Sequence, residues 1–537
     1  MSGLLGANAV VGGVSAATLP ENRGTRPLDA RTSRALKLRL AAAELESQRP
    51  SAIPQPNGDE TLYPNLIGTF TKGLPHSQLG EVDLGAYQSL MTAITSQSHA
   101  DAEKIQLGLG RKFVDIEASF AYNMDGADTY TFSIPPAPAF NSAQIAAEMV
   151  ELYWQALARD IPFTEWDSSP VIQAAAAELN GLSGYRGPRD AAGHVTTANV
   201  FRGYMPGNTT GPYTSQYLLQ TIYWGSTPRE QMYRTGMPGV DFMTDYSEWL
   251  LGQSGLPPYR TEVFDPTLRY IRTPRDLAQF VHWDCLCQSF LQASLILLDA
   301  RPETLLNYNL YQLSHTNPYK TSRIQTGFAT FGAAHIQDWV THVALLALKA
   351  TWNHKWAVHR RLRPEAFGGR VYNTLTGAAN YPIHRDLLNS QALRLTVQKT
   401  GGSLLPQAYV EGAPLHPSYP AAHATVAGAC VTLMKAFFEE TSLVSGVVVP
   451  TTDGLSLTPS DGLGLTIGGE LNKLAFNVAM ARNFAGIHYR SDADAGLAIG
   501  EEVAICFLKE QVNTFTETFQ GFAFTKFDGT KMLIAPG

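Results

Sequence analysis

The sequence predicts a mainly α-helical protein built around a bundle of long helices, with β-structure confined to minor hairpins. From Thr273 onward the chain contains apolar stretches with the length and periodicity of buried helices. They cover residues 277–298, 334 to about 363, 422–438 and the two segments that flank Gly486. Strand-like runs are short, and the pair at 447–449 and 455–457, around Asp453-Gly454, predicts a hairpin on the rim of the bundle.

The first 140 residues have a different character. They are rich in Pro, Gly, Asn and Ser and show little sustained period, apart from a short predicted helix near Arg34 to Gln48. We therefore expect residues 1–140 to wrap around the helical core. Asn141 is predicted to cap a following helix, and Pro162 follows its end.

Composition and local sequence argue against nucleic acid and a membrane as the main partners. The formal net charge is −7, from 40 basic and 47 acidic residues, and no basic tract favours nucleic acid. The N-terminus lacks the basic region of a signal peptide, and the uncharged stretch 413–434 contains three prolines, which makes it a poor membrane span. We expect a soluble, cytoplasmic protein that acts on small molecules.

The four cysteines give no zinc-site pattern. Cys285 and Cys287 form a C-x-C pair without a second pair, and Cys430 and Cys506 stand alone. All four lie in apolar contexts, so we expect buried free thiols.

The first candidate site is the stretch from Arg482 to Asp492. Arg482 and His488 are six residues apart and would lie on different faces of one continuous helix, so they converge only if the helix ends between them. Gly486 is placed to end it, and Ser491 or Asp492 can cap a second helix. Asp492 is then close enough to accept a proton from the ring of His488.

A second cluster contains Lys355 and Arg363. On one helix their side chains would be about 80° and about 12 Å apart, which lets both reach one anion, with Pro364 ending the helix. The alternative is that Lys355, Arg360, Arg361 and Arg363 form a solvated basic face at a helix C-terminus, where the dipole favours cations.

The third cluster is a proline-rich loop with two histidines, His416 and His423, leading into the apolar helix 426–438. A helix N-terminus supplies free backbone N–H groups that suit an oxyanion, although a histidine there is often only a cap or a core residue. Together the clusters offer three cations, the backbone donors of residues 421–423 and a directed imidazole nitrogen. This combination predicts a receptor for a tetrahedral oxyanion.

The order Lys-x7-Arg-Pro, Pro-x-x-His and Arg-x5-His-x3-Asp resembles the signature of the vanadium-dependent haloperoxidases and the related acid phosphatases. Further segments look like the bromoperoxidases of red algae and cyanobacteria: 63–65, 73–76, 80–83, 327–332 and 359–365. Length alone allows three or four domains. The resemblance instead implies one haloperoxidase domain over residues 1–537, with a helical core at 273–515 that carries the active site.

The resemblance also implies a role for each site residue. His488 would coordinate vanadium through one nitrogen, with Asp492 as its orienting partner. His423 would exchange a proton with hydrogen peroxide. The groups implied to hold the vanadate oxygens are Lys355, Arg363, Arg482 and the backbone of Ala421, Ala422 and His423.

By the same resemblance, V(V) acts as a Lewis acid, and bromide is oxidised by hydrogen peroxide to hypobromous acid, which halogenates organic nucleophiles. His416 stands where bromoperoxidases have a second histidine, so bromide is the expected halide, and Trp352 is expected to line the halide side. Related proteins of this length form homododecamers, which we also expect here. Whether calcium is bound stays open.

The chain departs from the family pattern at one point. Ala421-Ala422 replaces Ser-Gly, which removes a hydroxyl donor and should weaken vanadate binding by roughly 1.5–3 kcal/mol, or about 10- to 150-fold.

Two other functions stay open. One is an acid phosphatase with His488 as nucleophile and His423 as leaving-group acid, and the other is a non-catalytic oxyanion-binding protein.

Overall fold

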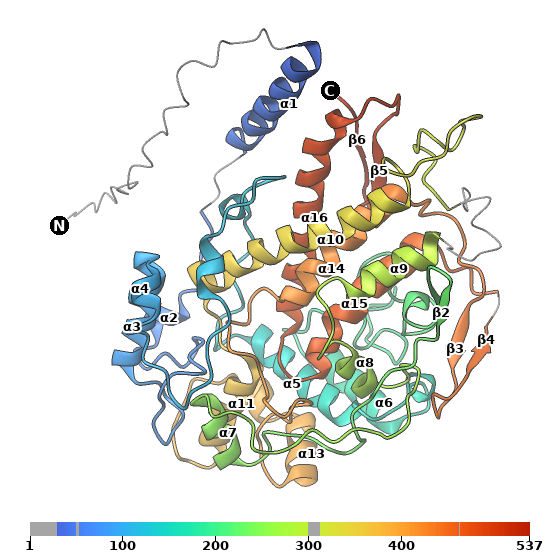
Figure 1. Ribbon diagram of the computed structural model, residues 1–537. Coiled ribbons are helices and arrows are strands. Elements are labelled where there is room, and N and C mark those ends of the chain that lie inside the picture. The colour runs from blue at the N-terminus through green and yellow to red at the C-terminus, as the bar shows by residue number, and fades with distance from the viewer. Residues whose placement is uncertain (1–28, 50–52, 299–311, 461) are drawn as a thin grey trace. The chain divides into compact units, whose positions relative to one another are not determined.

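The computed structural model describes residues 29–49, 53–298, 312–460 and 462–537. Packing divides the chain into two units, Met1–Gln48 and Arg49–Gly537. The described part of the first unit contains one helix, α1 (Ala30–Ser47). The second unit is mainly α-helical, as predicted (Figure 1).

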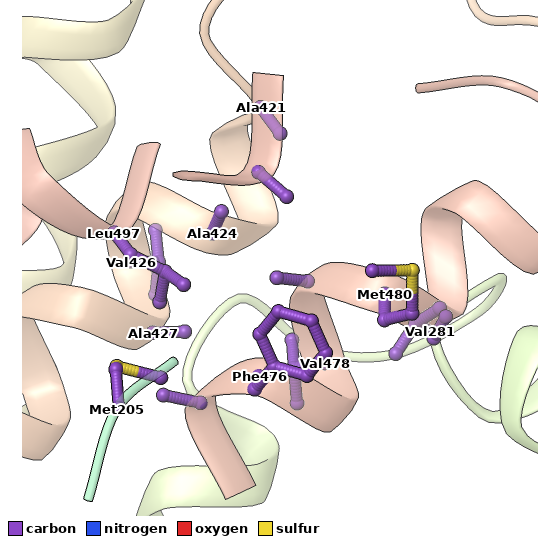
Figure 2. Packing of buried hydrophobic residues seen from close by; sticks show 14 of the residues in the cluster. Met205, Val281, Ala421, Ala424, Val426, Ala427, Phe476, Val478, Met480 and Leu497 are labelled. Atoms are coloured by element: carbon purple, nitrogen blue, oxygen red, sulfur yellow. The ribbon is translucent and has the colours of Figure 1, made fainter. Parts of the chain in front are cut away.

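Helix α14 (Ala422–Phe437) lies at the centre of the second unit, because every one of its residues except His423 is buried. It packs against α10 (Ala333–Trp352), α15 (Ile467–Phe484) and α16 (Arg490–Gln511). Glycines allow its close approach to α16, since a Cβ atom at Gly500 would overlap the carbonyl oxygen of Thr425. Figure 2 shows small side chains at this contact, including Ala424 and Ala427 near Leu497.

The remaining elements surround this centre. The other α-helices of the second unit are α2 (Asp59–Leu62), α3 (Leu84–Ser96), α4 (His99–Ala102), α5 (Ala143–Ala158), α6 (Pro170–Gly181), α7 (Tyr246–Gln253), α8 (Pro274–Phe280), α9 (Gln288–Leu298), α11 (Pro364–Leu375), α12 (Arg385–Leu388) and α13 (Gln391–Thr400). The strands form antiparallel hairpins β1 (Ile222–Trp224) with β2 (Thr227–Arg229), β3 (Val448–Pro450) with β4 (Leu457–Pro459), and β5 (Phe522–Thr525) with β6 (Lys531–Ile534). The β3–β4 hairpin is the predicted one.

Two predicted helices are interrupted. The helix expected at 277–298 is α8 and α9, separated by residues 281–287, whose polar groups bind side chains elsewhere in the fold. The helix expected to run to Arg363 ends as α10 at Trp352 and continues as a π-helical turn, η5 (Asn353–His359). Pro364 does not end that helix but begins α11, where its missing N–H costs nothing.

Three smaller expectations also need correction. Residues 84–96 form α3, with Leu90 and Ile94 buried, although no helix was predicted there. Ser142 rather than Asn141 caps α5. All four cysteines are free as expected, but only Cys430 and Cys506 are buried, whereas Cys285 is exposed and Cys287 is half-buried in the 281–287 segment, which is not helical. Among the described residues, no helix combines the length and apolarity needed to cross a bilayer.

Candidate active site

His488 lies in the break between α15 and α16, directly after the turn at Gly486, which has a φ of +86°. Its side chain is 2% exposed, with Nδ1 2.9 Å from Asp492 Oδ2 and Nε2 2.9 Å from Arg363 Nη1. A guanidinium can only donate, so Nε2 is the acceptor and Nδ1 carries the proton donated to Asp492. Burial and the Arg363 charge hold the pKa of His488 well below its usual range. The ring is therefore neutral, with a lone pair on Nε2.

Asp492 is the common acceptor behind this histidine. Its carboxylate accepts hydrogen bonds from Arg361 Nη1 at 2.7 Å, from the Ser418 hydroxyl and from the Tyr489 backbone N–H at 3.1 Å. Burial alone would raise the pKa of Asp492, but Arg361 and His488 lower it well below its usual range. The Tyr489 contact also shows that Asp492 caps α16 from inside its first turn, while the helix begins at Arg490.

Lys355, Arg363 and Arg482 all lie in the protein interior. Lys355 Nζ donates to the carbonyl oxygens of Pro417 and Ser418 at 2.6 and 2.8 Å. Arg482 Nη1 donates to the Val281 carbonyl at 2.8 Å. The alternative of a solvated basic face is therefore wrong. The prediction that one helix carries both Lys355 and Arg363 is also wrong, because Lys355 lies in the π-turn and Arg363 precedes α11.

These cations are electrostatically coupled. Burial, followed by the charges of Arg363 and Arg482, holds the pKa of Lys355 well below its usual range. Burial lowers the pKa of Arg363 to about 9, although Asp492 opposes this shift. Arg482 Nε is also buried and makes no hydrogen bond to the described residues. A bound anion would relieve the mutual repulsion and could accept from this unused donor.

Arg363 joins the two histidines that flank it. Besides His488, it contacts His416, with Nη2 3.0 Å from His416 Nδ1 and Nε 3.0 Å from the His416 carbonyl. Burial and the Arg363 charge hold the pKa of His416 well below its usual range, so this ring is neutral as well. The His416 ring lies against Trp352, with ring centres 4.9 Å apart. The motif spacing predicted that these residues share one site. It did not predict that Arg363 lies between His416 and His488 and contacts both.

His423 lies on the other side, in the first turn of α14. Its side chain is 27% exposed, and Nε2 is 3.0 Å from Asp284 Oδ1. Burial would raise the pKa of Asp284, but His423 and Arg482 lower it, so the carboxylate is ionised. Asp284 was missed because it comes from residues 281–287, which the sequence placed inside a helix. A carboxylate in an otherwise apolar stretch was the available signal.

The N-terminus of α14 has no side-chain cap. The Ala421 N–H donates to the Asp492 carbonyl at 2.9 Å, so this donor, expected to face an oxyanion, is already used within the protein. Ala421, which is labelled in Figure 2, directly precedes α14 and is fully buried in the main hydrophobic cluster. The backbone N–H groups that follow it belong to the uncapped first helical turn, which favours an anion.

A second layer of polar residues was also missed. Arg361 Nη2 lies 3.3 Å from Glu148 of α5, and its guanidinium stacks on Tyr489, 3.9 Å from the ring centre. Ser491 donates to the same glutamate at 2.7 Å. Arg361 and Ser491 stood within the quoted motifs, but Glu148 is more than 200 positions away in the chain and gave no signal.

Known proteins resemble both the sequence and the fold. A family model described as the VCPO second helical-bundle domain matches residues 396–517. The vanadium-dependent bromoperoxidase of Corallina officinalis is 35% identical over 94% of this chain and 99% of the relative. That of Ascophyllum nodosum is also 35% identical, over 93% and 92%. A homohexameric vanadate-dependent bromoperoxidase structure from Ascophyllum nodosum superposes with a TM-score of 0.89 at 30% identity, covering 94% of this chain and 90% of that one.

Proposed function

The chain belongs to the vanadium-dependent bromoperoxidase family, and we propose that it uses vanadate to oxidise bromide with hydrogen peroxide. In the balanced reaction, bromide gives two electrons to the peroxide, and with one proton the products are hypobromous acid and water. The acid then halogenates organic nucleophiles. The observation that carries the proposal beyond family membership is the neutral His488 ring, whose unprotonated Nε2 accepts a hydrogen bond from the buried Arg363.

The donor set fits vanadate. A tetrahedral oxyanion needs hydrogen-bond donors, and Arg482 Nε and the third N–H of Lys355 supply them beside Arg363. Vanadium needs one neutral nitrogen, which His488 presents while Asp492 fixes its tautomer. When bound, V(V) supplies the Lewis acidity that activates hydrogen peroxide toward bromide.

His423 is proposed as the acid–base residue. Its Nε2 proton donates to the ionised Asp284, so Nδ1 is the nitrogen that can take a proton from hydrogen peroxide. The Asp284 charge then stabilises the imidazolium. Asp284 is a positioning residue in this proposal, because it acts through His423.

The halide side is proposed to lie at His416 and Trp352. These rings pack together, and His416 accepts a hydrogen bond from Arg363. The bromide preference itself stays a prediction from the resemblance.

We propose a homo-oligomer, because the similar bromoperoxidase structure is homohexameric. The dodecamer and the single domain over 1–537 stay predictions. In the described parts of the chain, no group of three or more His, Cys, Asp and Glu side chains is placed to hold a metal ion, so we propose no calcium site.

The test is a bromination assay on vanadate-free protein with bromide and hydrogen peroxide. We expect activity to appear on adding micromolar orthovanadate and to fall when phosphate competes for the same donors. Activity without vanadate that follows iron or haem would refute the proposal. A phosphatase assay on the same samples tests the acid phosphatase alternative, which predicts phosphate-ester hydrolysis and no bromination.

A further inference from the structure

Helix α1 carries its charges against its own dipole. Its basic residues, Arg31, Arg34, Lys37 and Arg39, lie in the first ten positions, and its acidic residues, Glu44 and Glu46, lie in the last four. The N-terminal end of a helix is its positive pole and the C-terminal end its negative pole, so the basic and the acidic residues each lie at the end where the dipole opposes their charge. Asp29, which accepts from the Thr32 N–H at 2.8 Å, is the acidic cap before this basic half.

The same helix presents an apolar stripe. Leu36, Leu40 and Ala43 have the i, i+4, i+7 spacing of one helix face. Leu36 and Leu40 are 47% and 61% exposed, and no residue of α1 is buried. Most helical stability in proteins comes from the packing of an apolar face, so a partner surface over this stripe would stabilise α1.

We propose that α1 pairs with α1 of a second copy of this chain, antiparallel about a twofold axis. The inference rests on the homo-oligomer proposed above. Antiparallel pairing places each basic half beside the other chain's acidic half and aligns the two dipoles favourably. The two stripes meet, and Leu40 of one chain lies opposite Ala43 of the other.

The charge pattern specifies the register. Lys37 and Glu44 are seven residues apart and so lie on the same flank of the stripe. In a twofold interface residue i meets residue j and j meets i, so Lys37 of each chain faces Glu44 of the other. An anionic membrane or a nucleic acid would instead favour basic residues along the whole helix.

Zero-length carbodiimide cross-linking of the full chain tests this register. The reagent joins a carboxylate to an amine only when the two are in contact. Within one helix the Cα atoms of Lys37 and Glu44 are about 10 Å apart along the axis, so a link inside a single chain would need both side chains fully extended, and the link is therefore sought in the covalent dimer. We expect a covalent dimer on a denaturing gel, with a peptide linked between residues 37 and 44. The absence of a dimer, or a dimer without that link, would overturn the pairing.

Charge exchange supplies the matched controls. Lys37→Glu should lose the 37–44 link, and Lys37→Glu combined with Glu44→Lys should regain it with the partners reversed. Lys104→Glu changes an exposed lysine of the other unit and should leave the link intact. A link that survives Lys37→Glu, or that the double variant does not restore, refutes the register. Bromination measured on the same samples reports separately on the proposed function.

Discussion

At the scale of single residues, Asp492 determines which nitrogen of His488 carries the proton. Its carboxylate takes the Nδ1 proton and is itself held by Arg361, Ser418 and the Tyr489 backbone. The sequence predicted the His488–Asp492 contact, because the two lie four residues apart at a helix start. The support from Arg361 and Ser418 could not be predicted, because it depends on how distant segments pack.

Asp492→Asn should lower the free energy of unfolding by about 3–5 kcal/mol, the usual cost of breaking a buried ion pair from one side. The folded-state pKa of Asp492 is depressed, so its contribution is present above the ordinary carboxyl pKa and is lost as the pH falls. Denaturant unfolding of both proteins should therefore give a constant difference from about pH 5 to 7 and a smaller one below about pH 4. A difference that grows on acidification would contradict the assigned charge state.

His416→Phe should raise chloride oxidation relative to bromide oxidation. The substitution removes the acceptor of Arg363 Nη2 while keeping a ring against Trp352. The measurement is the ratio of kcat/KM for the two halides. An unchanged ratio would show that His416 does not set the halide preference.

Ala421→Ser tests the departure from the family pattern. If the restored hydroxyl reaches the oxyanion, vanadate should bind more tightly by about 1–3 kcal/mol. Ala422→Gly is the control, because it removes a methyl group and leaves the N–H. Titration of both single variants and the double variant gives their coupling. Since Ala421 is fully buried, a hydroxyl without a partner would destabilise the fold. An unaltered dissociation constant for vanadate would show that residue 421 does not contact the oxyanion.

At the scale of elements, the contact between α14 and α16 sets the positions of His423 and His488. Gly500→Ala would place a methyl group into the Thr425 carbonyl and push the two helices apart. We expect a loss of about 1–3 kcal/mol in stability and weaker vanadate binding, because His423 lies in the first turn of α14 and His488 precedes α16. Gly181→Ala at the end of α6 meets no atom and should have neither effect. Gly500→Ala with unchanged stability would show that the contact is looser than described.

Helix α14 was predicted because its apolar run is continuous, and α15 and α16 because Gly486 separates two periodic segments. The break between α8 and α9 was not predicted, because the stretch is apolar. The chain leaves the helix there because the Val281 carbonyl accepts from Arg482 and Asp284 pairs with His423. Local periodicity contains no information about such partners. The π-turn that carries Lys355 was missed for the same reason.

At the scale of the whole molecule, the N-terminal part of the second unit helps to hold residues 360–365, the segment that contains Arg363. The Phe70 N–H donates to the Arg360 carbonyl at 2.7 Å, and Lys72 pairs with Glu365 at 2.9 Å. These pairs join positions about 290 residues apart, so their identity could not be read from the sequence. Family membership over nearly the full chain is consistent with this dependence of the site on remote segments.

A vanadate titration of vanadate-free protein tests the proposed function most directly, with bound vanadate measured by equilibrium dialysis and bromination measured in the same samples. Wild-type activity should rise in proportion to bound vanadate, up to one vanadate per chain. His488→Ala should bind vanadate more weakly through the remaining cations and show no bromination at any occupancy, while the exposed control His194→Ala behaves as wild type. Wild-type bromination by vanadate-loaded His488→Ala would contradict the proposed role of His488, and wild-type activity independent of vanadate would contradict the proposed function.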